Sequence, residues 1–313
     1  MDWGYTLLGL AILLLAGDAL VKGAVNLALR VGIPALIVSL TVVAFGTSAP
    51  ELLISVQAIA EGLPGIAIGN VVGSNVANIL LVLGIPALLA TMHTSEHDTR
   101  TSYLQMLAAT VLFIGLCFFG VLTWISGLIL LAALAAMLTH AIVEVKRHRR
   151  AQCAADADVE GADPDMPWAK IAMSLVLGLV GLPLGAGLLV DGASGIARSF
   201  GISETVIGLT LVAVGTSLPE LATTVVAALR RQADVALGNV IGSNMFNLLG
   251  IMGVATLVGP VPIDPQFLSF DLWVMLGAAL LLIPFVFLRR DITRVWGIGL
   301  TLAYVAYLLA VLA

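Results

Sequence analysis

The sequence has few charged residues and almost no cysteine, and both shortages narrow the classes of protein that it can encode. Charged residues make up 11% of the 313 positions, whereas a soluble domain carries about 25%. Apolar residues make up 60%, and the mean hydropathy is +1.10. With two cysteines, Cys117 and Cys153, neither a disulfide framework nor a cysteine metal site is indicated. The composition therefore indicates a membrane protein and excludes an ordinary soluble domain.

The chain contains several long apolar segments. Runs of about 20 apolar residues recur along the chain, which is enough to cross a bilayer as helices. The first residues, MDWGY, lack the basic region of a signal peptide, so we expect the first segment to be retained. We count ten spans, near residues 7–29, 34–60, 67–89, two within 103–145, 169–197, 203–229, 236–258, 268–288 and 294–312.

One segment, VAFGTSAPEL at residues 43–52, places a carboxylate in these apolar surroundings. Thr47 and Ser48 precede Glu51 by four and three positions, so a helix puts all three side chains on one face. Pro50 has no N–H and crowds the carbonyl four residues earlier, so we expect the helix to kink or open there. In a membrane, loosened carbonyls are tolerated where they line a cavity or meet a ligand. The segment therefore predicts an oxygen-lined cation site.

This segment and a second one both occur twice. Residues 212–221 read VAVGTSLPEL, and GNVVGSNVAN at 69–78 returns as GNVIGSNMFN at 238–247. Both pairs are separated by 169 residues, and at least seven of every ten positions match within each pair. The matching residues include Gly, Thr, Ser, Pro, Glu and Asn, which an apolar composition does not favour. We infer an internal duplication.

The duplication divides the chain into two halves of five spans each. The first repeat covers residues 1–150, a short, acidic, unpatterned linker covers 151–166, and the second repeat covers 167–313. An odd number of spans per repeat makes the halves enter the membrane from opposite sides, an inverted repeat that many secondary transporters share. The expected fold class is an all-α polytopic membrane protein, with ten transmembrane helices in two inverted five-helix repeats.

The basic residues favour one orientation of this arrangement. With the N-terminus outside, Arg30, Arg100 and the KRHRR run at 146–150 fall at the cytoplasmic face, as do nearly all other Lys and Arg residues. The opposite orientation would violate the positive-inside rule. We therefore expect a multi-pass protein of the cell (inner) membrane, with both termini outside and the linker inside.

Two further polar features have ordinary interpretations. Asp18 and Lys22 in the first span are four residues apart, so we expect them to neutralise each other near the interface. His93 and His97 lie in a polar turn where no acid or third ligand is suitably placed. We therefore expect a solvated loop there, not a metal site.

Every candidate ligand in the duplicated segments is an oxygen. The segments contain no Cys or His, which argues against zinc, copper and iron and for Ca²⁺, Na⁺, K⁺, Mg²⁺ or H⁺. Glu51 and Glu220 are equivalent, and a buried acid in a membrane helix costs roughly 2.5–3.5 kcal/mol. Serine and asparagine share a helical face in the third span and in its repeat, at Ser74 with Asn78 and at Ser243 with Asn247. Two carboxylates balance one Ca²⁺ or a pair of Na⁺ ions, which suits a pocket that exchanges them in turn.

The asparagines between these residues have a different expected role. Asn75 and Asn244 lie on another face of the helix, where amides commonly form hydrogen bonds between helices. We expect these two side chains at helix contacts.

The paired FGTSAPE/VGTSLPE and GNVVGSN/GNVIGSN motifs resemble the alpha repeats of the calcium/cation antiporter superfamily, and most closely those of prokaryotic sodium/calcium exchangers. The resemblance covers essentially the whole chain. It implies an alternating-access antiporter in which inward movement of Na⁺ drives Ca²⁺ outward. It also implies that the first and sixth spans are long oblique helices that slide during access switching.

The resemblance further implies a set of ion ligands. In that family two glutamates bind Ca²⁺ and Na⁺, and they fall on Glu51 and Glu220. The implied ligands that accompany them are Thr47, Ser48, Ser74, Thr216, Ser217 and Ser243, the backbone oxygens of Ala44 and Ala213, and the amides Asn78 and Asn247. Some relatives carry Asp at the last position, so the charge of this site differs from theirs.

Three alternatives stay open from the sequence. A proton-coupled cation exchanger of the same superfamily would share the architecture, and a cation channel could also use a glutamate pair. An intramembrane hydrolase would need a Ser/His, HExxH or paired-aspartate arrangement, and none appears. The sequence implies no enzyme activity, no cofactor, no nucleic acid and no protein partner. The expected ligands are the transported ions, Ca²⁺ and Na⁺, and the lipid bilayer.

The inverted arrangement predicts the sidedness of two positions. In a chain from which Cys117 and Cys153 have been removed, a cysteine placed at Ala155 should react with an impermeant thiol reagent only from the cytoplasmic side. A cysteine placed at Ala313 should react only from outside. Reaction of both from the same side would contradict the five-plus-five arrangement.

Overall fold

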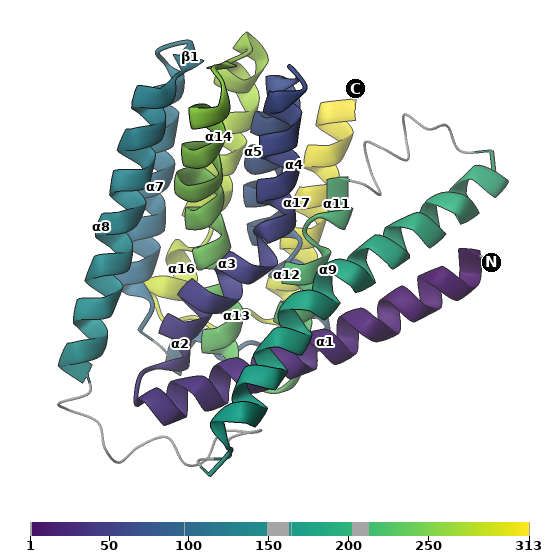
Figure 1. The fold of residues 1–313 in the computed structure, drawn as a ribbon, viewed down its shortest axis with the longest axis vertical. Coiled ribbons are helices and arrows are strands. Elements are labelled where there is room, and N and C mark those ends of the chain that lie inside the picture. The colour runs from purple at the N-terminus through teal and green to yellow at the C-terminus, as the bar shows by residue number, and fades with distance from the viewer. Residues whose placement is uncertain (1, 97, 149–162, 164, 202–212, 313) are drawn as a thin grey trace.

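The computed structural model describes residues 2–96, 98–148, 163, 165–201 and 213–312, and most of this part of the chain is helical (Figure 1). The first half contains α1 (Asp2–Val31), α2 (Ala35–Val38), η1 (Ser39–Val43), α3 (Ala44–Thr47), α4 (Ala49–Ala60), α5 (Pro64–Leu80), α6 (Gly84–Leu89), η2 (Thr94–Glu96), α7 (Arg100–Cys117), β1 (Val121–Leu122) and α8 (Trp124–His148). The second half contains α9 (Trp168–Ser199), α11 (Ala213–Gly215), α12 (Leu218–Leu229), α13 (Ala233–Met245), η4 (Phe246–Ile251), α14 (Met252–Val258), β2 (Val261–Pro262), η5 (Phe267–Asp271), α15 (Leu272–Leu280), α16 (Ile283–Val286) and α17 (Arg294–Leu312).

These helices match the expected spans wherever the structure describes them. Eight are long and apolar enough to cross a membrane, and the bent pair from Ala35–Thr47 to Ala49–Ala60 makes a ninth span among the described residues. The remaining expected span, 203–229, lies partly outside the described residues, and its last part forms α11 and α12. The chain is therefore an integral, multi-pass helical membrane protein.

Two helices, α5 and α13, form the centre of the bundle. Their apolar side chains, among them Val71, Val76, Val240 and Ile241, are fully buried and belong to one continuous core. Helices α8 and α17 leave most of their surface uncovered, as expected of helices that face lipid. The duplicated GNVVGSN and GNVIGSN segments therefore lie in the best-packed part of the protein.

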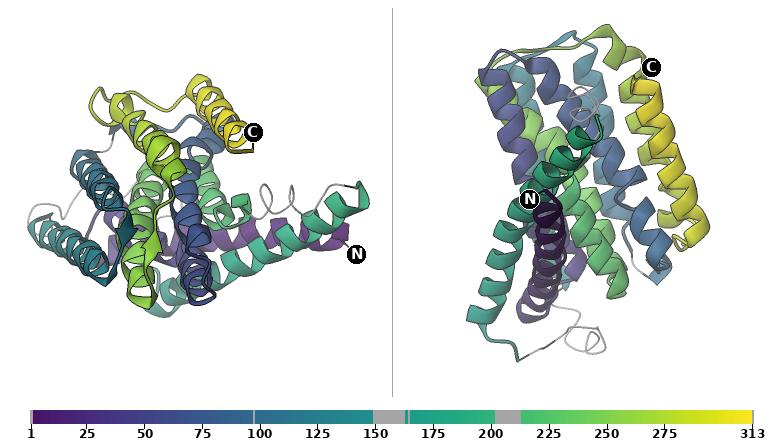
Figure 2. Two further views of the ribbon diagram at one scale, coloured as in Figure 1. Left: turned by 90° about the horizontal axis from the view of Figure 1, so that it is seen from above. Right: turned by 90° about the vertical axis from the view of Figure 1, so that its right-hand side faces the viewer.

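Helices α1 and α9 form a separate pair that crosses the bundle obliquely (Figures 1 and 2). Small residues let their backbones approach closely, as is common between membrane helices. A Cβ atom built at Gly178 of α9 would lie 2.5 Å from the Cβ of Leu20 of α1, and one built at Gly9 would lie 2.7 Å from the carbonyl oxygen of Gly185. The two helices consequently pack as one unit.

The charges of α1 are paired differently from the sequence prediction. Asp18 does not pair with Lys22 but with Arg230, which follows α12, and Arg230 Nε donates a 2.7 Å hydrogen bond to Asp18 Oδ1. The prediction was wrong because Asp18 lies beside Gly17, on the face of α1 that packs against α12. The planar guanidinium of Arg230 then reaches it with two donors.

The backbone repeats at the same spacing as the motifs. Six described residues have φ between +50° and +80°, and they form three pairs, each 169 residues apart. The pairs are Gly32 with Gly201, Gly62 with Arg231, and Gly120 with Arg289. Equivalent turns of the two halves therefore adopt the same left-handed conformation, even where only one member of a pair is glycine.

Loops of the two halves pair at both ends of the bundle. At one end β1 and β2 form an antiparallel pair, in which Leu122 faces Val261. At the other end Met92 and Ile292 form an antiparallel bridge through hydrogen bonds of 3.1 Å in each direction. The loop that contains Met92 precedes α7, and β1 follows α7. The two contacts therefore lie at opposite ends of that helix (Figure 1).

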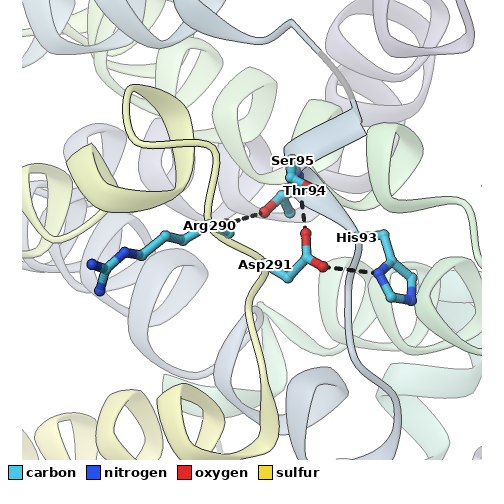
Figure 3. Close-up of polar contacts among 5 residues, drawn as sticks. All are labelled: His93, Thr94, Ser95, Arg290 and Asp291. Carbon is cyan, nitrogen blue, oxygen red and sulfur yellow. Dashed lines mark hydrogen bonds and ion pairs between the residues drawn. The ribbon is translucent and has the colours of Figure 1, made fainter.

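The bridge at Met92 and Ile292 is reinforced by side chains (Figure 3). Asp291 accepts hydrogen bonds from the backbone N–H of Ser95 at 3.1 Å and from His93 Nδ1 at 2.9 Å, and Thr94 Oγ1 donates to the carbonyl of Arg290 at 2.8 Å. Partial burial of Asp291 raises its pKa, but the hydrogen bonds from Ser95 and His93 outweigh this effect and hold the pKa below its usual range. His93 is exposed, as predicted for a solvated loop, and His97 lies outside the described residues.

Candidate functional site

A helix breaks in each half of the chain, immediately before the proline and glutamate of the repeated motif. Ser48 separates α3 from α4 with φ −86° and ψ 7°, and Ser217 precedes α12 with φ −86° and ψ 4°. In the first half the two helix segments are bent by 44°. Pro50 and Pro219 lie in the first turn of the new helix, where a missing N–H costs nothing. The predicted opening near Pro50 is confirmed.

The two glutamates are buried next to these breaks. Glu51 and Glu220 are each 1% exposed, and they are near enough to interact electrostatically. Ser48 Oγ, from the first half, donates to Glu220 Oε1 at 3.0 Å, and Ser243 Oγ donates to the same oxygen at 3.5 Å. A hydroxyl from one break thus reaches the carboxylate of the other, so residues of both repeats meet at one place.

Several buried oxygens of the predicted ligands have no hydrogen-bond partner among the described residues. They are Glu51 Oε2, Glu220 Oε2, Ser217 Oγ, Asn78 Oδ1 and Asn247 Oδ1. All five belong to buried side chains, and a buried polar atom without a partner costs about 1–3 kcal/mol. A cation that binds these oxygens would remove that cost and balance the carboxylates.

The remaining predicted residues surround this group with differing contacts. Ser74 is buried on α5, one turn before Asn78, and Thr216 is partly buried between α11 and α12. Thr47 Oγ1 contacts Asn239 Oδ1 and the carbonyl of Ala44, at 3.3 Å each. That carbonyl also accepts the N–H of Ser48 at 3.1 Å, so part of its capacity is already used. Ala213 is the first residue of α11.

The side chain of Asn244 lies at a helix contact, as predicted, but that of Asn75 does not bond between helices, because its amide reaches the carbonyl of Val71 four residues earlier in its own helix at 2.6 Å. Asn244 Nδ2 donates to the backbone oxygen of Asn75 at 3.4 Å, and Asn78 Nδ2 donates to Asn244 Oδ1 at 3.1 Å. These bonds join α5 to α13 across the centre of the bundle. They also use the amide nitrogen of Asn78, whereas its oxygen has no partner among the described residues.

Two further residues, which were not predicted from the sequence, hold the glutamate segments. Asn70 Nδ2 donates to the backbone oxygen of Glu51 at 3.2 Å and to Ser55 Oγ at 3.0 Å. Asn239 Nδ2 makes the same two contacts in the second half, to the backbone oxygen of Glu220 at 3.3 Å and to Thr224 Oγ1 at 3.2 Å. Both are the asparagine of the duplicated GNV sequence, and this repetition was the sequence feature that pointed to a shared role.

A cavity lies beside both breaks. It has a volume of about 210 Å³ and is lined by Pro50 and Pro219 from the breaks and by Pro183 and Val190 from α9. Thr216 also lines it, so the cavity reaches a predicted ligand. Among the described residues, no group of three or more His, Cys, Asp or Glu side chains is placed to hold a metal. The candidate donors are two carboxylates with hydroxyl and amide oxygens, which would suit hard cations.

Comparison with known proteins identifies relatives along the whole chain. The sequence profile of the sodium/calcium exchanger protein family matches residues 1–143 and 170–313. The putative antiporter CaxA of Alkalimonas amylolytica is 37% identical over 97% of this chain and 96% of its own length. The sodium/calcium exchanger MaX1 of Methanosarcina acetivorans is 34% identical over 96% of each protein. The solved structure of the sodium-calcium exchanger NCX_Mj, soaked with zero Na⁺ and Ca²⁺, superposes with a TM-score of 0.82 at 33% identity, covering 99% of this chain and 98% of that one.

Asn70 and Asn239, which we call the asparagine braces, can be distinguished by mutation from asparagines that only fill the core. Asn70→Ala and Asn239→Ala should each weaken Ca²⁺ binding about thirtyfold, because each change removes two donated hydrogen bonds worth about 1 kcal/mol apiece that hold a glutamate segment. The measurement is titration calorimetry on purified protein. Asn75→Ala is the matched control, since its amide bonds only to Val71 of its own helix and should change the affinity less than threefold. An equal loss in all three variants would contradict the bracing role.

Proposed function

This chain belongs to the sodium/calcium exchanger family, and from that premise we propose that it is a secondary active antiporter that exchanges Na⁺ for Ca²⁺ by alternating access. The observation that carries the proposal is the contact of Ser48 with Glu220 across the two repeats, together with five buried oxygens of the predicted ligands that have no described partner. Such a group is unfavourable when empty and favourable around a cation. The family consists of exchangers, which supports a carrier over a channel or a hydrolase.

We assign the ions to one site that both repeats share near the middle of the membrane. Glu51 and Glu220 supply charge and up to four oxygens, and hydroxyl, amide and backbone oxygens complete the six to eight ligands that Ca²⁺ prefers. The proposed ligands accompanying the glutamates are Ala44, Thr47, Ser48, Ser74, Asn78, Ala213, Thr216, Ser217, Ser243 and Asn247. Two Na⁺ ions neutralise the same carboxylates, so the two substrates compete for one dianionic site.

An inverted pair of repeats supports this mechanism. We propose that residues 1–150 and 167–313 are five-helix repeats of opposite orientation, with ten spans in total. The antiparallel contacts at Met92 with Ile292 and at Leu122 with Val261 support this, because Met92 and Val261 are equivalent by the 169-residue spacing yet lie at opposite ends of the bundle. Two halves related in this way can exchange conformations. The site then opens to one side of the membrane or to the other. The positive-inside rule puts the Met92 end in the cytoplasm.

The paired glutamates generate the first test of this function. Glu51→Gln and Glu220→Gln should each reduce Na⁺-dependent Ca²⁺ transport at least a hundredfold, because one remaining charge leaves a divalent ion half compensated in a medium of low dielectric constant. Protein yield should be unaffected, since a neutral amide is less costly to bury than a carboxylate.

The matched control is Glu61→Gln, which removes a carboxylate from the exposed end of the same helix segment. Its transport should stay within twofold of the wild type. Near-normal transport by either Glu51→Gln or Glu220→Gln, at normal expression, would refute the shared site.

The neutral amide at Asn247 generates a second test, on the choice of ions. The charge of the proposed site comes from Glu51 and Glu220 alone, and Ca²⁺ neutralises it. An added K⁺ would leave a net positive charge buried in the membrane, which is costly. Na⁺-gradient Ca²⁺ flux should therefore be the same with and without K⁺ on both sides, at a clamped membrane potential. A strict K⁺ requirement would refute the ligand assignment, and equal flux driven by a pH gradient without Na⁺ would favour a proton-coupled exchanger.

A further inference from the structure

The α1–α9 pair packs unequally against the two broken helices. Gly17 of α1 lies against α12, where a Cβ built at Gly17 would lie 3.2 Å from the carbonyl oxygen of Ala222 and 3.4 Å from Val226. Ala222 and Val226 are accordingly buried, each 7% exposed. α12 is the part of its span that follows the break, and the proposed orientation puts it in the inner half of the membrane.

The equivalent surface in the first half is uncovered. Counting back 169 residues, Ala222 corresponds to Leu53 and Val226 to Gln57 on α4. Leu53 is 69% exposed and Gln57 is also exposed. If α9 packed on α4 as α1 packs on α12, both side chains would be covered. The structure is therefore closed on the inner side of the site and less covered on the outer side.

An ion pair accompanies the closed side and has no equivalent on the other. Asp18 of α1 accepts from Nε and Nη2 of Arg230 at the end of α12, and both side chains are partly exposed, Asp18 at 42% and Arg230 at 26%. The corresponding positions are Gly187 on α9 and Glu61 at the end of α4. A glycine and a carboxylate cannot form an ion pair, so the second half of the α1–α9 pair lacks this contact.

We propose that the Asp18–Arg230 ion pair is a latch at the inner face, which holds α1 against α12 and favours the conformation with the site open to the outer side. The inference rests on the proposed function, because it assumes two access states. The latch forms in one state and breaks in the other, since α1 must leave α12 for the inner side to open. Its asymmetry makes the two otherwise equivalent states unequal in energy.

The size of the effect follows from the exposure of the pair. Partly exposed ion pairs shift an equilibrium by roughly twofold to fivefold. Such a shift is large enough to alter how often the inner side opens. It is also small enough for the transport cycle to continue, because a much tighter pair would hold the protein in one state.

The test measures opening directly, without transport. Val226→Cys, in a chain lacking Cys117 and Cys153, places a thiol beneath α1, and a charged impermeant thiol reagent is applied to the cytoplasmic side. Asp18→Asn and Arg230→Gln should each raise the labelling rate roughly twofold to fivefold. The charge-reversed pair, Asp18→Arg with Arg230→Asp, should return the rate toward that of the parent chain.

Two controls make these changes specific. Lys22→Gln removes a charge one turn from Asp18 on the same helix and should leave the labelling rate unchanged. Unchanged rates in both Asp18→Asn and Arg230→Gln would overturn the proposal, and so would an equal rise in Lys22→Gln. Because labelling needs no ion flux, a parent chain that fails to carry Ca²⁺ would refute the proposed function and leave the latch to be judged by these rates.

A gain-of-function variant covers the case in which loss of the pair prevents folding. A Cβ built at Gly187 meets nothing within 4 Å, so an aspartate fits there. Glu61 has φ −84° and ψ 0°, close to the −86° and 8° of Arg230. Gly187→Asp combined with Glu61→Arg should build a second latch on the outer side and raise labelling of Val226→Cys from the cytoplasm, whereas either change alone should not. A double variant that labels like its single variants would contradict the proposal.

Discussion

Two carboxylates buried together in an apolar bundle are the constraint on which the rest of this structure depends. Glu51 and Glu220 repel each other and are shielded from water, so the protein must surround them with groups that tolerate negative charge. Two hydroxyls are directed at Glu220, that of Ser48 from a helix break and that of Ser243 from within α13. The oxygens that still lack partners would be satisfied by a bound cation, as the proposed function requires. Breaks, asparagine braces and a tightly packed centre all serve that arrangement.

The duplication explains how one chain builds such a site. Each repeat contributes a glutamate, a break and a brace, at positions 169 residues apart, and the left-handed turns follow the same spacing. Positions at which the two repeats differ are then informative, because they show contacts that only one half makes. Asp18 with Arg230 is one departure, since Gly187 and Glu61 replace it in the other half. In the proposed mechanism the repeat supplies two access states, and such differences decide which one is preferred.

The parts of this protein that depend on local chemistry were predictable from its sequence. The break before Pro50 follows from a missing N–H, and the place of Asn244 at a helix contact follows from helical periodicity. Contacts between distant segments were not predictable in this way. Asn70 and Asn239 act across to the neighbouring helix, so their role depends on the rotation of one helix against another. Asp18 was assigned to Lys22 because a single sequence reveals only local pairs, whereas its partner lies 212 residues away.

Uptake of radioactive calcium into proteoliposomes that contain the purified protein tests the central claim most directly. Vesicles loaded with Na⁺ are compared with vesicles loaded with choline, at equal pH on both sides and with the membrane potential clamped. The account predicts rapid Ca²⁺ accumulation that requires internal Na⁺ and ends when the Na⁺ gradient is dissipated. Equal uptake with choline inside would contradict Na⁺-coupled exchange, because the movement of Ca²⁺ would then not depend on the ion that shares its site.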